Sequence, residues 1–286
     1  MISFENKSLK MNRNIKKAAF LGMGRMGKAL SDAFIKEGIY TKNEVVGTHH
    51  NAVIANEISQ SLGFEIITSN SEAIEISEMI YLCIRPQQIP GIIDELKSKI
   101  SSEKILVSIA VGVPLKWLRN KLKNCGPIFH VHPSSLVMAK SPGVSYITCE
   151  EQISQEIKNE VENIWKALGD TYFVEEKTMD FCAVFSGTSS AFFSRLAIIW
   201  EKLAVKYAFS EEMAHKIVIY IFNGFYHAYK ETNLNFEEIE DKIATPGGVT
   251  RAGLKKLDEE GFEEALENVV IRSLERIEEI RSIFKE

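Results

Sequence analysis

A glycine triplet near the N-terminus constrains the fold of this chain more than any other feature. The segment "AAFLGMGRMGKAL" (18–30) places Gly22, Gly24 and Gly27 in the spacing Gly-x-Gly-x-x-Gly, directly after an apolar run and at the start of an amphipathic stretch. This spacing suits a tight strand-to-helix turn in which the second glycine leaves room for a pyrophosphate and the third allows close packing. The N–H groups and the dipole at the helix start favour an anion. The pattern predicts a dinucleotide-binding βαβ unit, and its alternative is a glycine-rich turn without a ligand.

The first half of the chain continues this alternation of short β-rich runs and amphipathic stretches. Repeated βαβ units of this kind predict a parallel sheet. After Glu176 the strand patterns end, and 180–209 and 262–284 carry apolar residues at helical spacing. We therefore expect an α/β chain, with a Rossmann-type doubly wound sheet in 16–175, an all-helical domain in 176–286 and a loose extension in 1–15. The expected strands are Lys17–Leu21, Val45–Thr48, Phe64–Ile67, Met79–Ile84, Ile105–Ala110, Ile128–His130, 143–148 and 170–175.

Composition excludes several classes of protein. The 286 residues carry a net charge of -5 without a cluster of Lys and Arg, so we expect no nucleic-acid partner. No apolar run reaches the ~18 residues of a spanning helix, and the N-terminus lacks a signal-peptide core, which favours a cytoplasmic protein without a membrane partner.

His130 and His132 resemble a metal pair, but no third ligand follows by spacing, so we expect no metal site. We expect them instead to line a polar cleft at a strand end, where one of them could touch the substrate.

The end of the second expected strand bears on the choice of cofactor. An NAD-binding unit usually has an acid ~20 residues after the glycines, whereas this chain has Thr48, His49, His50 and Asn51. Without an acid to repel a 2′-phosphate, and with several hydrogen-bond donors, NADPH is favoured and NADH remains possible. The alternative for His49 and His50 is that they are solvated loop residues.

The segment "ATPGGVTRAGL" (244–254) interrupts the helical half with a proline and two glycines. Consecutive backbone N–H groups ahead of a helix form a small concave site for a carboxylate or phosphate. Thr250 adds a hydroxyl that can donate or accept a hydrogen bond. The alternative is an ordinary turn between helices, with Thr250 as the N-cap.

These segments together resemble the pyrroline-5-carboxylate reductase family. The stretch 244–280 is similar to the family's Ser/Thr-Pro-Gly-Gly-x-Thr loop and the long helix beyond it. "FLGMGRMGKAL", "YLCIRPQQI" (81–89), "LVSIAVGV" (106–113) and "FSEEMAHKIVIYIFNG" (209–224) resemble further family segments in register. The resemblance implies a helical dimerisation domain, a homodimer or higher homo-oligomer, and NADPH-dependent reduction of a cyclic imine carboxylate. The substrate it implies is 1-pyrroline-5-carboxylate, which is reduced to proline.

The resemblance also implies a site, position by position. Gly22, Met23, Gly24, Arg25, Met26 and Gly27 would hold the pyrophosphate, and Asn70 would lie beside the adenosine end. Cys83, Ile84, Arg85 and Pro86 would border the nicotinamide together with Ile109, Ala110 and Val111. The amides of Gly247, Gly248 and Val249 and the Thr245 hydroxyl would hold the substrate carboxylate, Thr250 would face the ring nitrogen, and Glu231 would be an acid beside the substrate.

The sequence departs from the family pattern in three places. "HPSSL" (132–136) replaces Met-Pro-Asn-Thr-Pro, "GTSSAFF" (187–193) replaces Gly-Ser-Gly-Pro-Ala-Tyr, and Arg85 replaces a lysine. The small residues 186–190 would permit close approach of a partner or a ligand or, equally, a tight contact between helices. The alternatives are therefore a paralogue that reduces a different imine acid and a non-catalytic nucleotide-binding dimer. A β-hydroxyacid dehydrogenase would use a lysine such as Lys202 or Lys206, but the glycine-rich motif of that class is missing around both.

Overall fold

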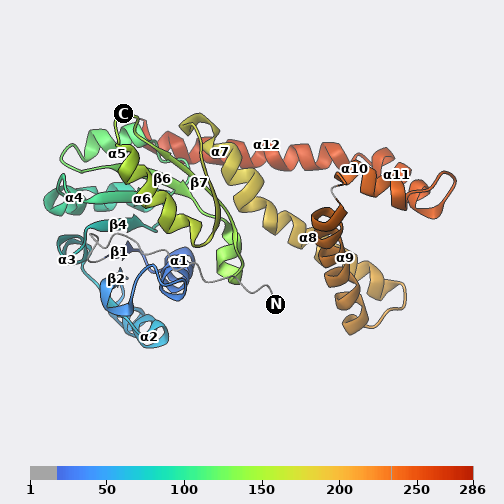
Figure 1. Ribbon diagram of the computed structural model, residues 1–286, viewed down its shortest axis with the longest axis horizontal. Coiled ribbons are helices and arrows are strands. Elements are labelled where there is room, and N and C mark those ends of the chain that lie inside the picture. Colours follow the sequence, from blue (N-terminus) through green and yellow to red (C-terminus); the bar gives the residue numbers. More distant parts are fainter. Residues whose placement is uncertain (1–17, 233, 286) are drawn as a thin grey trace. The chain divides into compact units, whose positions relative to one another are not determined.

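The computed structural model describes residues 18–232 and 234–285 (Figure 1), so the predicted N-terminal extension lies outside the described residues. The chain forms two compact units. One contains the described residues up to Thr188 together with those from Leu274 onward, and the other spans Ser189–Ser273. The domain boundary expected near residue 175 stays a prediction.

The first unit is built on an eight-stranded sheet with the order β3-β2-β1-β4-β5-β6-β7-β8. The six strands from β3 to β6 run parallel, as the alternating pattern predicted. The strands are β1 (Ala18–Leu21), β2 (Val45–Thr48), β3 (Glu65–Ile67), β4 (Met79–Leu82), β5 (Ile105–Ser108), β6 (Ile128–His132), β7 (Gly143–Cys149) and β8 (Gly169–Phe173).

Strand β7 departs from the parallel pattern, because it runs antiparallel to β6. Only residues 133–142 join the two strands, and they contain a short 3₁₀ helix, η3 (Ser135–Ala139). A parallel return needs a crossover of a dozen or more residues, usually a helix, so this connection reverses the chain direction instead.

Helices cover both faces of the sheet, which explains why β1, β2 and β4 are buried at every position. On one face the core contains Phe34 of α1 and Trp165 of α6 packed on Tyr81. On the other face it contains Ile74, Ile93 and Leu118, together with Phe284 near the C-terminus. The helices of this unit are α1 (Arg25–Lys36), α2 (Ala52–Leu62), α3 (Asn70–Glu75), α4 (Ile89–Lys99), α5 (Leu115–Lys121), α6 (Gln155–Lys166) and α7 (Met179–Cys182).

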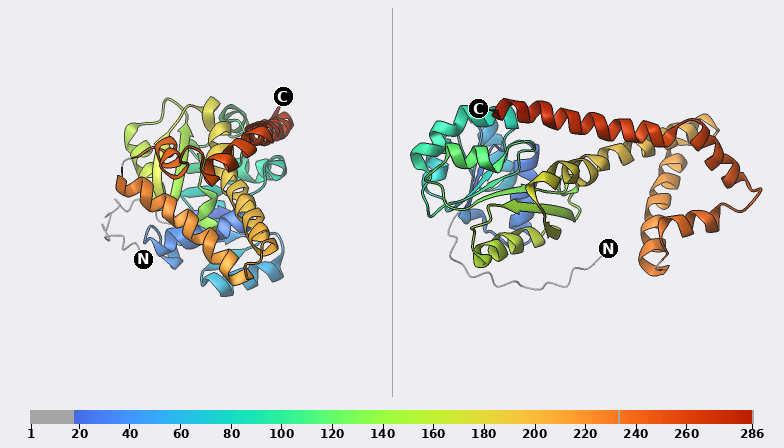
Figure 2. Two further views of the ribbon diagram at one scale, coloured as in Figure 1. Left: turned by 90° about the vertical axis from the view of Figure 1, so that its right-hand side faces the viewer. Right: turned by 90° about the horizontal axis from the view of Figure 1, so that it is seen from above.

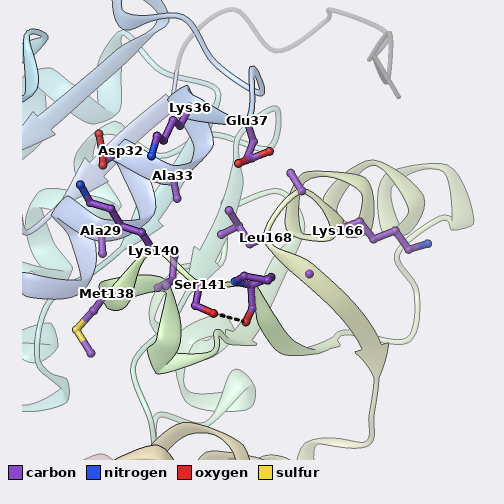
Figure 3. Close-up of a pocket in the computed structure, with 14 residues that line it drawn as sticks. Ala29, Asp32, Ala33, Lys36, Glu37, Met138, Lys140, Ser141, Lys166 and Leu168 are labelled. Carbon is purple, nitrogen blue, oxygen red and sulfur yellow. Dashed lines mark hydrogen bonds between the residues drawn. The ribbon is translucent and has the colours of Figure 1, made fainter. Parts of the chain in front are cut away.

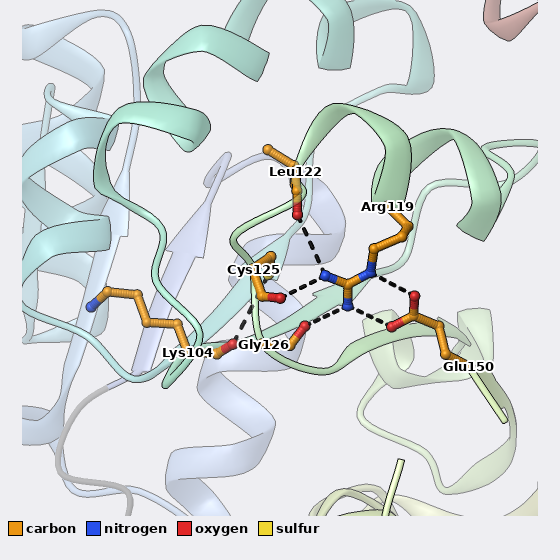
Figure 4. Close-up of polar contacts among 6 residues, drawn as sticks. All are labelled: Lys104, Arg119, Leu122, Cys125, Gly126 and Glu150. Carbon is orange, nitrogen blue, oxygen red and sulfur yellow. Dashed lines mark hydrogen bonds and ion pairs between the residues drawn. The ribbon is translucent and has the colours of Figure 1, made fainter. Parts of the chain in front are cut away.

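An arginine clamp joins α5 to the two strand connections beside it (Figure 4). The Arg119 guanidinium donates to both carboxylate oxygens of Glu150 at 2.6 Å and to the carbonyls of Cys125 at 2.6 Å and Gly126 at 2.7 Å. The hydrogen bonds that Arg119 donates to Glu150 raise the pKa of Arg119. Because a planar fork matches a carboxylate and two carbonyls at once, arginine suits this position and lysine does not.

The second unit is helical, with α8 (Ser189–Lys206), α9 (Glu211–Thr232), α10 (Phe236–Ile243), α11 (Val249–Glu259) and most of α12 (Phe262–Arg281). Ser210 caps α9, since its hydroxyl accepts a hydrogen bond from the Met213 amide at 3.2 Å. Helices α8 and α9 lie against each other (Figure 2). Many of their large apolar side chains are nevertheless exposed, among them Phe193, Trp200 and Tyr220. Apolar surface of this extent is typical of a protein–protein or membrane interaction site.

The segment Glu176–Lys206 corrects one expectation from the sequence. It is long and apolar enough to cross a membrane by length and composition, with a mean hydropathy of 1.4 over its best window. Scattered polar residues interrupt the apolar residues of this segment, although its mean hydropathy over 18 residues is high.

Candidate active site

The loop after β1 has the shape that the glycine triplet predicted. Gly22 has φ +95°, and a Cβ placed there would lie 2.4 Å from Cγ2 of Ile84. A Cβ on Gly27 would lie 2.3 Å from the Gly22 carbonyl oxygen, so these two positions require glycine. A Cβ on Gly24 would meet nothing within 4 Å, which leaves open space in front of the loop.

Helix α1 begins at Arg25, directly behind this loop, with Gly24 as its N-cap. The amides of Arg25, Met26 and Gly27 lie in its first turn, where helix geometry provides no partner for an N–H. A tight turn, an open approach and unpartnered amides are what a pyrophosphate requires, so the residues present fit a dinucleotide. The side chain of Met23, by contrast, is buried below the loop.

Thr48 lies under the glycine loop, where it anchors the loop to the next strand end. Its hydroxyl accepts from the Gly22 amide at 3.1 Å and donates to Oδ1 of Asn70 at 2.7 Å. The residue is 2% exposed, so its one hydroxyl proton is already used inside the protein. The expected role of Thr48 as a direct donor to a 2′-phosphate is therefore not supported, because its hydroxyl is buried and already donates to Asn70.

The two adjacent histidines follow Thr48 at the end of β2. Their rings stack at a centroid distance of 4.6 Å, and the Asn51 amide donates to Nδ1 of His49 at 3.2 Å. Asn51 caps α2 by accepting from the amides of Val53 and Ile54. His50 is exposed and His49 is half-buried, so both remain candidates for the ribose end of a cofactor.

Backbone hydrogen bonds tie the carboxyl ends of four neighbouring strands into one edge. The Met23 amide donates to the Thr48 carbonyl at 2.8 Å, Cys83 to Leu21 at 2.8 Å, and Ile109 to Leu82 at 3.3 Å. The predicted cofactor segments 22–27, 48–50, 83–86 and 109–111 consequently lie side by side. Ligands of open α/β sheets bind at this edge, where the strand order reverses between β1 and β4.

Within the β4 and β5 segments the side chains differ in exposure. Burial raises the pKa of the Cys83 thiol, which keeps it protonated and unreactive near neutral pH. Arg85 is exposed and precedes the turn Pro86–Gln88, while Ala110 is buried. Ile84, Ile109 and Val111 are half-buried, which suits contact with a flat ring.

The segment 244–250 belongs to the second unit and forms a tight turn ahead of α11. Pro246 and Gly247 occupy its corners, Gly247 has φ +75°, and the Gly248 amide donates to the Thr245 carbonyl at 3.0 Å. These features define a type II turn. Arg251 holds the turn against α10 by donating to Asp241 at 2.8 Å and to the Ala244 carbonyl at 2.9 Å.

This geometry corrects two expectations about the loop. The N-cap of α11 is Gly248 and not Thr250, which is the second residue of the helix. The Gly248 amide closes the turn, so it is not free to hold a carboxylate. The amides that helix geometry leaves without a partner belong to Val249, Thr250 and Arg251. Val249 is 93% exposed, so the start of α11 is open.

Glu231 lies near the end of α9 in the same unit. Its carboxylate pairs with Nδ1 of His227 at 3.4 Å, and both side chains are exposed. Its expected role beside the substrate stays a prediction.

The histidines of β6 lie in the interior and not along an open cleft, contrary to expectation. Burial is the main cause that lowers the pKa of His130 to about 3 and that of His132 to about 4, so both rings are neutral. Among the described residues, Nε2 of His130 and both ring nitrogens of His132 have no hydrogen-bond partner.

A close fit to a second segment explains the position of His132. A Cβ on Gly187 would lie 2.1 Å from Nε2 of His132, so the glycine admits the ring. Gly187 belongs to a π-helical segment, Ala183–Thr188, of the kind that interrupts helices at functional positions. The small residues 186–190 predicted the close approach of a partner, a ligand or another helix, and at Gly187 the group that approaches is the buried ring of His132.

Comparisons with known proteins agree with this architecture. A protein-family model described as pyrroline-5-carboxylate reductase dimerisation matches residues 176–280, and one described as NADP oxidoreductase, coenzyme F420-dependent, matches residues 17–112. The pyrroline-5-carboxylate reductase of Methanosarcina acetivorans is 28% identical over 264 residues, which cover 92% of this chain and 97% of that protein. Pyrroline-5-carboxylate reductase 1 of Bacillus subtilis is 24% identical, with 93% and 89% covered.

A solved structure supports the fold over nearly the whole chain. The crystal structure of Plasmodium falciparum pyrroline carboxylate reductase with NADP bound superposes with a TM-score of 0.85 at 23% identity, covering 94% of this chain and 98% of that one. The glycine loop, the interrupted helical half and the matches to both halves of the chain agree with one another. Over nearly its whole length the chain is similar to pyrroline-5-carboxylate reductases, which are oxidoreductases, and residues 176–280 match that family's dimerisation model.

Proposed function

We propose that the protein reduces 1-pyrroline-5-carboxylate to proline with NADPH. The observation that carries this proposal is the start of α11, where a type II turn presents unpartnered amides and a threonine hydroxyl at one open helix end. The names of the curated relatives support the same reaction.

Different groups at the start of α11 would bind the carboxylate and the ring nitrogen of the substrate. The amides of Val249, Thr250 and Arg251 would hold the substrate carboxylate, aided by the helix dipole and the exposed Thr245 hydroxyl. The Thr250 hydroxyl would hydrogen-bond the ring nitrogen as its charge changes. A protonated cyclic imine is already electrophilic, so the protein mainly has to orient it.

The cofactor would lie on the β1–β4–β5 edge, with the pyrophosphate on residues 22–27. A bound reduced nicotinamide supplies hydride to the imine carbon, and a proton on nitrogen completes the amine. We propose NADPH over NADH because His49 and His50 stand at the end of β2 where an NAD-binding unit usually has an acid.

We also propose that the active form is a homodimer or a higher homo-oligomer. The matched dimerisation model and the exposed apolar side chains of α8 and α9 support this assembly. The same self-association would bury the apolar segment Glu176–Lys206. Light scattering after size exclusion should give at least twice the 32.3 kDa chain mass.

The test is loss of nicotinamide absorbance with NADPH and 1-pyrroline-5-carboxylate. Thr250→Ala should lower kcat about 10- to 100-fold with NADPH affinity unchanged, the loss expected for one hydrogen bond to a charged group. Thr250→Ser, which keeps the hydroxyl, should retain most of the rate. A wild-type protein that binds NADPH without oxidising it would refute the reductase proposal and favour a nucleotide-binding regulatory dimer. A panel of cyclic imine acids decides whether a related acid is the better substrate.

A further inference from the structure

The first unit contains a cavity away from the strand ends that hold the predicted cofactor segments. Its volume is about 230 Å³, and it lies between the second half of α1, the segment 137–142 and the junction of α6 with β8. None of the predicted cofactor or substrate residues lines it.

The floor of this cavity is apolar. Ala29 and Ala33 lie four residues apart on one face of α1, and their small side chains leave the space open. Val137 and Leu168 complete the floor from the opposite side. The volume falls below the ~300 Å³ at which pockets for drug-sized ligands begin, so a compact molecule fits it and a nucleotide does not.

Charges of both signs surround the apolar floor. Lys36 and Lys140 provide ammonium groups, and Asp32 and Glu37 provide carboxylates. No ion pair engages any of these four within the part of the chain that the structure describes. Figure 3 shows Lys36 and Lys140 extending along the side of α1 that carries Asp32, whereas Lys166 points away from α1 and pairs with Glu162 at 3.0 Å.

Lys140 has an unusual backbone conformation for a residue at a cavity. It ends η3 in the left-handed region with φ 57°, where glycine or asparagine is the ordinary choice. Residues held in that region concentrate at ligand sites. A lysine in place of glycine here adds a cation to the cavity and strains the backbone.

We propose that this cavity binds a free amino acid with a compact apolar side chain in its zwitterionic form. The carboxylate would face Lys36 and Lys140, the ammonium would face Asp32 on the same side of α1, and the side chain would lie on the floor. A simple anion would meet the two acidic side chains, and a purely apolar molecule would leave all four charges unused. The proposal does not depend on the proposed reaction, because the two sites share no residue.

The experiment is calorimetric titration of the full-length protein with L-leucine and L-proline. L-leucine is compared with 4-methylpentanoate, which lacks the amine, and with 3-methylbutylamine, which lacks the carboxylate. We expect saturable binding of L-leucine at one site per chain. L-proline is titrated for comparison, because as the product of the proposed reaction it would also bind at the start of α11. Each truncated analogue should bind about tenfold or more weakly than leucine, as loss of one charged hydrogen-bonding group requires.

Variants assign the binding to this cavity. Lys140→Gly removes the ammonium and relieves the left-handed strain, so it should fold normally and weaken binding about tenfold. Asp32→Asn should do the same, and Ala33→Leu should fill the cavity and abolish binding. Lys166→Gln is the matched control, with binding unchanged. Turnover of 1-pyrroline-5-carboxylate is assayed in parallel and should persist in Lys140→Gly.

Three results would overturn the proposal. The first is no saturable heat with L-leucine in the wild-type protein. The second is equal affinity for leucine and 4-methylpentanoate, which would make the cavity a plain anion site. The third is amino-acid binding that survives both Lys140→Gly and Ala33→Leu with unchanged Tm, which would place the ligand elsewhere.

Discussion

Replacing Thr48 with valine separates two roles for this residue. Valine keeps the shape of threonine but removes the hydroxyl that accepts from the Gly22 amide at 3.1 Å and donates to Asn70 at 2.7 Å. Because Thr48 is 2% exposed, water cannot replace these hydrogen bonds at the hydroxyl position. The variant therefore leaves a loop amide unsatisfied beneath the predicted pyrophosphate site.

The size of the effect follows from that lost partner. An unsatisfied buried donor costs about 1–3 kcal/mol, which corresponds to about a 5- to 150-fold change in an equilibrium constant. If Thr48 acts by holding the loop, Kd for NADPH and Kd for NADH rise by the same factor within this range. If its hydroxyl bound a 2′-phosphate, only the affinity for NADPH would fall.

The assay is titration of nicotinamide fluorescence with each cofactor. Thr48→Ser is the control, because it keeps the hydroxyl and should leave both Kd values unchanged, with a stability loss of about 1 kcal/mol for the missing methyl. Selective loss of NADPH affinity in Thr48→Val would refute the anchoring role and restore the direct contact.

Further predictions concern the interior of the first unit. Gly187→Ala should destabilise the protein by about 1–3 kcal/mol because its methyl overlaps Nε2 of His132; His132→Ala in the same chain should recover part of that loss, and additive losses in chemical denaturation would contradict the contact. Arg119→Lys should lower the free energy of unfolding by about 2–3 kcal/mol through loss of the fork to Glu150, and with it Tm; a calorimetric scan that shows no shift in Tm would count against the clamp. The free energy of unfolding should be constant above the ordinary histidine pKa of about 6.5 and decrease as pH falls towards 4. The reason is that His130 and His132 bind protons in the unfolded chain but stay neutral in the folded protein, where burial lowers their pKa. The free energy of unfolding should change by at most about 1.4 kcal/mol per pH unit for each ring, and His132→Gln should reduce this pH dependence. An unchanged pH dependence would show that other groups cause the loss of stability at acid pH.

Local sequence patterns were sufficient to predict most of the fold. The eight strands were predicted to within a few residues at each end, because alternating apolar runs and turn residues act over short stretches of chain. The glycine triplet was sufficient to predict the loop after β1. At Gly22 and Gly27 a side chain would overlap neighbouring atoms, so only glycine allows this turn. The reversal of β7 was missed because strand direction depends on the length of the connection.

Roles that depend on contacts between distant residues could not be assigned from sequence. Thr48 looked like a ligand until its hydroxyl was found between Gly22 and Asn70, and His132 looked like part of a cleft until Gly187 was found against its ring. Hydrogen-bond donors are used up by whichever partner the fold brings within about 3 Å, and spacing along the chain does not reveal that partner. The sequence by itself determined the strands, the helices and the glycine loop, and only the tertiary structure decided which of their polar groups stay free for a ligand.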